Sequence, residues 1–169
     1  MIILGIDPSL RRSGFGVIRM LSAERAEIID CGVINVSASA PQSECLRRLH
    51  GGMKELVEAY HPAQVSIESP FYGKNVKTAM ILSMARGVII AAMAEAAIPV
   101  YAYSPRQAKK SAVGSGSASK EQVAAMLAAR FQLEVKNIPD DATDALALAL
   151  CHGQLAMVPA LSVMLPKPL

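Results

Sequence analysis

The fold is decided by the stretch Ile2-Ile3-Leu4-Gly5-Ile6-Asp7-Pro8, together with the segment Ser13-Gly14-Phe15-Gly16-Val17 that returns from it. The first stretch is an apolar strand that ends at an acid and a turn residue. Glycines in the second allow another backbone to approach closely. With one further strand, the pattern predicts an antiparallel meander over 2–7, 14–21 and 26–36.

Helices and strands alternate after the meander. Apolar residues at helical spacing predict helices over 41–61 and 76–96, each followed by a strand, over 63–68 and 98–103. Three more helices are expected: over 105–113, over 119–131 with a capping-box start, and from Pro139 to about Cys151. Because this alternation makes parallel neighbours, we expect an α/β fold in which helices flank the sheet.

Length and composition favour a single compact domain. The chain has 169 residues, and its hydrophobic share of 52% is ample for a buried core. We expect this domain to cover 1–153 and residues 154–169 to form a poorly fixed tail. The N-terminus lacks the basic segment of a signal peptide, and the apolar run 79–94 is too short to span a bilayer. A cytoplasmic protein with no membrane role is therefore expected.

Four acidic side chains lie at the ends of apolar elements: Asp7, Glu68, Asp141 and Asp144. No Lys or Arg adjoins any of them in sequence, and an unpaired carboxylate at the rim of a buried element is costly to desolvate. Asp141 and Asp144 share one face of a helix, while the acids that end strands point out of one sheet edge. The four therefore predict a shared site for Mg²⁺ or Mn²⁺, which suits phosphodiester hydrolysis.

Each acid taken singly has a second interpretation, as a helix cap or a surface acid. Asp140 fits the cap better than a ligand and is not counted. Asp144 lies inside the predicted helix, where an acid has no capping role, so the ligand interpretation is favoured. The net charge of +3 comes from 17 basic and 14 acidic residues. Setting the four acids aside leaves 17 against 10, which favours a nucleic-acid partner.

The helix over 76–96 is apolar nearly all round, whereas a helix on one side of a sheet needs only one apolar face. Two explanations stay open at this point. A second copy of the chain could cover the other face, or the C-terminal helices of the same domain could do so.

Five different motifs follow one another along residues 2–152. They are the opening hairpin, Ile67-Glu68-Ser69-Pro70-Phe71-Tyr72-Gly73-Lys74-Asn75, Ala85-Arg86-Gly87, the segment 113–123, and Asp141-Ala142-Thr143-Asp144-Ala145-Leu146-Ala147. In this order and spacing they resemble the RuvC family of bacterial Holliday junction resolvases. The hairpin alone also fits actin-like kinases and ATPases, but these need two such domains and a second phosphate loop.

The resemblance implies a ribonuclease H-like fold, whose five-stranded mixed sheet joins a three-stranded antiparallel meander to parallel strands. It implies a homodimer that resolves four-way (Holliday) DNA junctions in recombination and repair. Paired symmetric nicks would leave 5′ phosphate and 3′ hydroxyl ends. Two Mg²⁺ ions per active site would be held by Asp7, Glu68, Asp141 and Asp144, with Mn²⁺ as a substitute. The RuvA and RuvB branch-migration proteins would be partners.

Basic and aromatic residues are assigned by the same resemblance. Lys109 and Lys120 match family lysines near the scissile phosphate, with Lys110 as an alternative to Lys109 and a solvated role as the alternative for each. Phe71, with Tyr72, would stack on an unpaired base at the branch point, unless either packs on its own loop. Candidate contacts to DNA phosphates are Arg11, Arg12, Lys74, Lys77, Arg106 and Lys110.

Two features do not follow the family pattern. Ser9 and Leu10 stand where the family usually has Gly after Asp-Pro, so the turn geometry stays open, although Ser is an ordinary turn residue. The tail after His152 carries only Lys167 as a charge, so it is not expected to be an important electrostatic arm for DNA. His152 itself follows the last acid by two helical turns; it is interpreted as a helix-end histidine and assigned no role. Two rival functions also stay open: a junction-binding module without chemistry, and an RNA-processing nuclease of the same fold.

Overall fold

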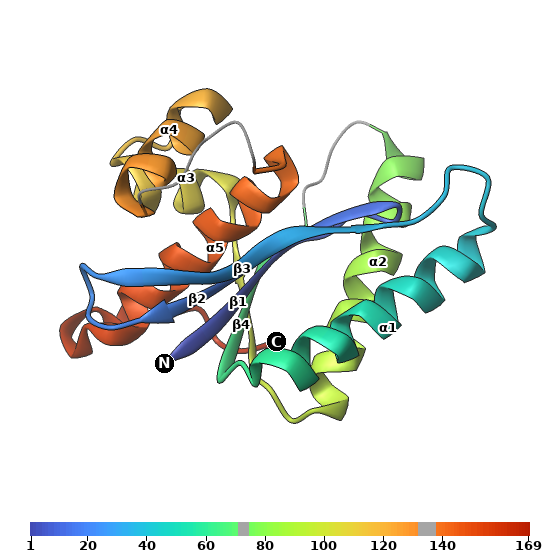
Figure 1. Ribbon diagram of the computed structural model, residues 1–169, viewed down its shortest axis with the longest axis horizontal. Helices are drawn as coiled ribbons and strands as arrows, with labels where there is room; N and C mark the ends of the chain where they lie inside the picture. The colour runs from blue at the N-terminus through green and yellow to red at the C-terminus, as the bar shows by residue number, and fades with distance from the viewer. Residues whose placement is uncertain (71–74, 132–137) are drawn as a thin grey trace.

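The computed structural model describes residues 1–70, 75–131 and 138–169 of the chain (Figure 1). Its strands are β1 (Ile2–Asp7), β2 (Arg12–Met20), β3 (Ala26–Asn35), β4 (Gln64–Glu68) and β5 (Val100–Tyr103). Its helices are α1 (Gln42–Tyr60), α2 (Val76–Glu95), α3 (Pro105–Val113), α4 (Lys120–Phe131), α5 (Asp140–Met157) and the 3-10 helix η2 (Pro159–Met164). The predicted elements are present, and most of their ends lie close to the predicted ones.

The strands form one mixed sheet in the order β3-β2-β1-β4-β5. Strand β1 pairs antiparallel with β2 and parallel with β4, and β4 pairs parallel with β5. This confirms the predicted five-stranded sheet, in which parallel strands extend an antiparallel meander. In the register, Ile6 lies opposite Ile67, so the acids that end β1 and β4, Asp7 and Glu68, follow at the same edge.

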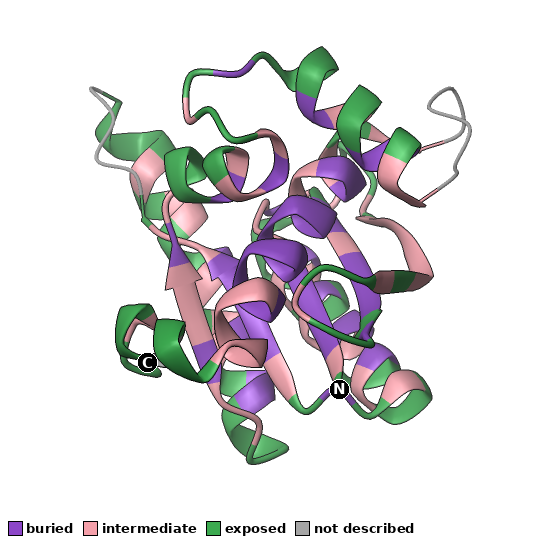
Figure 2. Ribbon diagram, turned by 90° about the vertical axis from the view of Figure 1, so that its left-hand side faces the viewer, coloured by how far each residue is buried: buried purple, intermediate pink, exposed green. Residues whose placement is uncertain are grey.

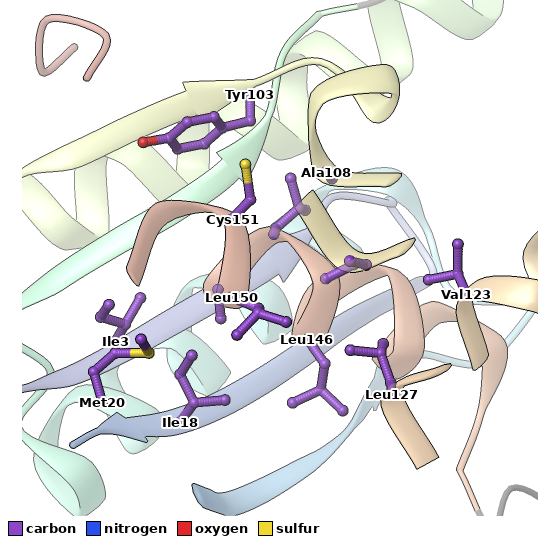
Figure 3. Close-up of a cluster of buried hydrophobic side chains, with 14 of the residues drawn as sticks. Ile3, Ile18, Met20, Tyr103, Ala108, Val123, Leu127, Leu146, Leu150 and Cys151 are labelled. Carbon is purple, nitrogen blue, oxygen red and sulfur yellow. The ribbon is translucent and has the colours of Figure 1, made fainter. Parts of the chain in front are cut away.

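Helices cover both faces of the sheet, with α3, α4 and α5 on one face and α1 with α2 on the other (Figure 1). Side chains along β1 alternate between these faces. Ile3 packs in the cluster that includes α5 (Figure 3), while Leu4 and Ile6 pack in the cluster that includes α1 and α2. By the same alternation, Asp7 points to the α5 face.

Strand β4 follows the same rule. Val65 and Ile67 pack with α1 and α2, whereas the side chain of Gln64 turns to the other face and bonds to His152 of α5. Glu68 shares the side of the strand on which Gln64 lies, so it also points to the α5 face. Both strand-end acids therefore face the helix whose first turns carry the other two acids.

Helix α5 lies directly against the backbone of the opening hairpin. A Cβ atom added to Gly5 would be 2.0 Å from the carbonyl oxygen of Ala145, and one added to Gly14 would be 2.0 Å from that of Asp141. Real Cβ atoms essentially never approach other atoms within 3.0 Å, so these positions require glycine. Figure 2 shows this side of the molecule, with a helix at its centre that is buried along much of its length.

Helix α5 extends further than predicted. It continues to Met157, so the predicted end at about Cys151 was wrong, and the boundary expected after residue 153 falls inside the helix. Residues 154–157 are Gln, Leu, Ala and Met, which are good helix formers, and Pro159 follows them.

The last residues of the chain are attached to the domain. The 3-10 helix η2 packs on α5, and the backbone N–H of Leu169 donates to the carbonyl of Val100 at 2.9 Å. The expectation of a poorly fixed tail beyond His152 was therefore wrong. Two features explain the attachment. The tail is mostly apolar, and the carbonyl of Val100 lies on the edge strand β5, where it can accept a hydrogen bond from the tail.

Helix α2 leaves an apolar surface uncovered. Val76 is 70% exposed, Met80 61% and Met84 38%. The C-terminal helices lie on the opposite face of the sheet, so the interpretation that they cover α2 was wrong (Figure 1). Among the described residues, α2 is also the one helix whose length and mean hydropathy of 1.6 would let it cross a membrane, and 22% of that stretch is buried in the fold.

Candidate active site

Three of the four predicted acids surround one pocket at the end of β1 and β4. The pocket has a volume of about 290 Å³, and its charged lining consists of Asp7, Glu68, Asp144, Lys109 and Lys120. Apolar residues of α3, α4 and α5 form most of the remaining wall. The structure thus gathers acids from two strands and a helix that are far apart in sequence, with two of the predicted lysines beside them.

Asp141 lies next to this pocket, in the first turn of α5. Its Oδ2 atom is 2.7 Å from Nε of Arg12, and its side chain is 30% exposed. The negative charge of Asp141 contributes to raising the pKa of Asp7, so the two carboxyl groups are within electrostatic reach of each other. The four acids therefore form one electrostatic cluster.

The pKa of Asp7 is raised from its ordinary value of 3.8 to about 7. Burial is the largest cause, because it removes the carboxylate from water, and the charges of Glu68, Asp144 and Asp141 add to it. The pKa of Glu68 is also raised, first by burial and then by Asp144, while its hydrogen bond with Asp7 acts in the opposite direction. Burial and repulsion among the carboxylates therefore both oppose full ionisation of the cluster.

Lys120 and Lys109 bring positive charge to the pocket. Nζ of Lys120 lies 2.7 Å from Oδ2 of Asp144, and this hydrogen bond is the main cause of the raised pKa of the lysine. Nζ of Lys109 donates to the carbonyl oxygen of Ala118 at 2.9 Å, which ties α3 to the segment before α4. Both ammonium groups therefore have a defined position at the pocket wall.

The donor set fits a hard divalent cation. All four acids offer carboxylate oxygens, which Mg²⁺ and Mn²⁺ prefer, and a bound cation would relieve the repulsion among them that adds to burial in raising the pKa of Asp7. Within residues 1–70, 75–131 and 138–169, no three acid, histidine or cysteine side chains are already arranged to hold a metal ion. Asp141 and Asp144 are instead each bonded to a basic side chain. A cation bound by all four acids would compete with these two basic side chains for the carboxylates.

Two of the predicted phosphate contacts lie on the side of the opening hairpin and α2. The guanidinium of Arg11 donates to the carbonyl oxygens of Ser37 and Ala40, at 2.5 and 3.0 Å. It therefore ties the loop before α1 to the hairpin. Lys77 is exposed in the first turn of α2.

Two more predicted contacts lie beside α3. Arg106 and Lys110 line a second pocket, of about 490 Å³, which the loop 114–117 completes. Both side chains belong to exposed residues. Phe71, Tyr72 and Lys74 lie outside the residues that the structure describes, so their roles stay predictions.

Two residues that were given no role by the sequence make defined contacts in the fold. Arg86 donates to the backbone carbonyl of Glu68, and its charge in the middle of the mostly apolar stretch 79–94 of α2 was the signal that could have found it. His152 is fully buried within α5, where Nδ1 bonds to the hydroxyl of Tyr103 at 2.7 Å and Nε2 to Gln64 at 2.8 Å. Burial lowers the pKa of His152 to about 4. Its interpretation as a helix-end histidine was therefore wrong, because α5 continues past it.

Comparison with known proteins identifies the family. The chain matches the family model for "Crossover junction endodeoxyribonuclease RuvC" over residues 3–152. Proteins of that name from Roseiflexus sp. (strain RS-1) and Protochlamydia amoebophila (strain UWE25) are 43% and 40% identical to it. The matched regions cover 90% and 94% of this chain, and the same shares of the two relatives.

Solved structures show the same relationship. The fold is similar to that of T. thermophilus RuvC in complex with Holliday junction substrate, with a TM-score of 0.88 at 34% identity, over 100% of this chain and 99% of that one. The yeast mitochondrial Holliday junction resolvase Ydc2, at 14% identity and a TM-score of 0.68 over 90% of this chain and 77% of that one, shares the fold alone. These likenesses confirm the predicted ribonuclease H-like fold and leave the kinase interpretation without support. The chain therefore belongs to the RuvC family of crossover junction endodeoxyribonucleases.

Proposed function

We propose that this protein is a metal-dependent nuclease that resolves four-way DNA junctions by paired symmetric nicks, in recombination and repair. The observation that carries the proposal is the gathering of Asp7, Glu68 and Asp144 with Lys109 and Lys120 around one pocket, in a member of this family. A relative from T. thermophilus has been solved in complex with a Holliday junction substrate. The products would carry 5′ phosphate and 3′ hydroxyl ends.

The four acids are proposed to hold two divalent cations, Mg²⁺ or in its place Mn²⁺. When bound, such ions offset the charge that develops on the phosphoryl group and favour the ionisation of water. Because the acids project from β1, β4 and α5, which are rigid parts of the core, their oxygens are held in place by the fold. Lys109 and Lys120 would add positive charge where a phosphate enters the pocket.

The surface around the pocket is proposed to hold the junction. Arg106 and Lys110 are exposed beside α3 and would contact phosphates without reading sequence, and Lys77 would do the same from α2. Arg11 and Arg12 lie at the opening hairpin, with Lys74 beyond the described residues. Phe71 and Tyr72, also beyond them, would stack on an unpaired base.

A homodimer is proposed as the acting form. The exposed apolar side chains of α2, among them Val76, Met80 and Met84, offer a surface that a second copy of the chain would cover. A twofold axis would then present two equal pockets to two strands of like polarity. The RuvA and RuvB branch-migration proteins are proposed as partners in the cytoplasm, on the strength of family membership.

The function is tested by cleavage of a synthetic four-way junction, compared with linear duplex and structured RNA of equal length. With Mg²⁺, we expect paired nicks in the junction alone, and with Ca²⁺ binding without cleavage. Asp7→Asn should keep junction binding and lose cleavage. Asp140→Asn is the matched control, since it removes an exposed acid at the N-terminus of α5, next to Asp141. Equal nicking by wild type and Asp7→Asn would reject the proposed site, and preferred cleavage of RNA would reject the substrate.

A further inference from the structure

Two of the four acids in the cluster already have a positively charged partner. Lys120 is bonded to Asp144 and Arg12 to Asp141, each at 2.7 Å. Asp7 and Glu68 instead lie close to each other, and neither forms an ion pair within the described residues. The lysine also lines the pocket, whereas Arg12 does not, so the function of the arginine is not explained by contact with a substrate in that pocket.

The fold directs Arg12 toward Asp141. Arg12 begins β2, and Gly14, two residues later, lies against the backbone of Asp141. Residues two apart on a strand point to the same side, so the side chain of Arg12 projects onto the first turn of α5. The preceding residue, Arg11, points to the other side and bonds to loop carbonyls.

The pair is set up for exchange with a cation. Guanidinium groups stay charged at every accessible pH, so the partner of Asp141 cannot be removed by deprotonation. Arg12 bonds to Oδ2 of Asp141, an oxygen that would also serve as a metal ligand. Its side chain is 56% exposed, so it is free to swing into solvent or onto a phosphate when it leaves. The contact is therefore held weakly enough to be displaced.

We propose that Arg12 is a resident counter-ion that competes with the divalent cation for Asp141 and so lowers the metal affinity of the site. This rests on the proposed function, because it assumes that Asp141 binds the metal. Removing the guanidinium frees the carboxylate and removes a positive charge from beside the bound ion. Arg12 thus acts as a positioning residue, which holds Asp141 while the metal is away and gives it up when the metal binds.

The test is Mn²⁺ binding to the DNA-free protein, followed by the electron paramagnetic resonance signal of the free ion. Arg12→Gln should bind Mn²⁺ about three- to tenfold more tightly than wild type, as expected when a partly exposed ion pair and a like-charge repulsion are both removed. Arg12→Lys should stay within about twofold of wild type, because it restores the charge. The exposed position of Arg12 makes both substitutions compatible with the fold.

Arg19→Gln is the matched control. Arg19 lies on the same strand and pairs with an acid, Glu27, at 3.7 Å, but at the opposite end of β2. Arg19→Gln lowers the net charge by the same amount as Arg12→Gln, and it should leave the Mn²⁺ affinity unchanged. In an Asp141→Asn background, Arg12→Gln should also have little effect, because no carboxylate is left to compete for.

The outcomes separate the two proposals. If Asp7→Asn abolishes Mn²⁺ binding but Arg12→Gln binds like wild type or more weakly, the competition is overturned while the metal site stands. Equal tightening by Arg12→Gln and Arg19→Gln would also overturn it, as a general effect of charge. If wild type itself shows no Mn²⁺ binding, the metal site of the proposed function fails, and the competition fails with it.

Discussion

Replacing Gly5 with alanine should separate helix α5 from the sheet. The added Cβ would lie 2.0 Å from the carbonyl oxygen of Ala145 and 2.8 Å from the backbone nitrogen of Ala149, so the obstacle is backbone and cannot rotate away. Ordinary contact begins at 3.4 Å, so α5 or β1 must retreat by about 1.4 Å. Overpacking against a rigid element of this kind costs about 3 kcal/mol of unfolding free energy.

The same retreat should impair catalysis, because α5 carries Asp141 and Asp144 while β1 carries Asp7. A misplacement of roughly 1 Å between reacting groups lowers rates by about a hundredfold. Urea unfolding would measure the stability, and junction cleavage at saturating Mg²⁺ would measure the rate. Gly87→Ala is the control, since nothing lies within 4 Å of its added Cβ and alanine is favoured in a helix. A Gly5→Ala protein that is as stable and as active as wild type would refute the close packing of α5.

Two further predictions concern titration and a buried network. Because the folded pKa of Asp7 is raised above its unfolded value, its protonated form favours folding, and the stability of the metal-free protein should fall as pH rises from about 4 to about 7. Asp7→Asn should flatten this slope and gain about 1 kcal/mol or more over wild type at pH 8; a wild type with no such slope in urea titrations would contradict the raised pKa. Tyr103→Phe should cost about 1–2 kcal/mol, because it leaves Nδ1 of the buried His152 without its partner. Tyr101→Phe, which keeps the ring stacked on that histidine, is its control, and equal unfolding energies for the two variants would count against the network.

The fold was predictable because most of its elements have a strong local signal. Apolar runs ending at Asp7 and Glu68 gave both the strands and the acids, and the parallel pairing of β1 with β4 then places those acids at one edge. The glycines of the opening hairpin signalled close backbone approach, and the structure shows that α5 is the element that approaches. These predictions needed only local signals: the apolar pattern of a strand, the acid that ends it, and the glycines within it.

Side-chain contacts between α5 and the sheet could not be predicted in the same way. The bond between Arg12 and Asp141 depends on the start of β2, which lies before the predicted strand, and on the depth at which α5 sits. The contacts of His152 join residues far apart in sequence, and a histidine among alanines and leucines carries no signal for such partners. Helix α5 was predicted too short because His152 and Gly153 interrupt its apolar pattern, although the helix formers beyond them continue it.

Helix α5 is the central buried helix of one layer and also the bearer of two of the four acids. Because α5 is buried in the core, the core and the four-acid site form in the same folding event. A folded molecule therefore already has its four acids in place. Under the proposed function, cleavage would then be limited by the supply of DNA substrate and metal, and little by rearrangement of this layer of the fold.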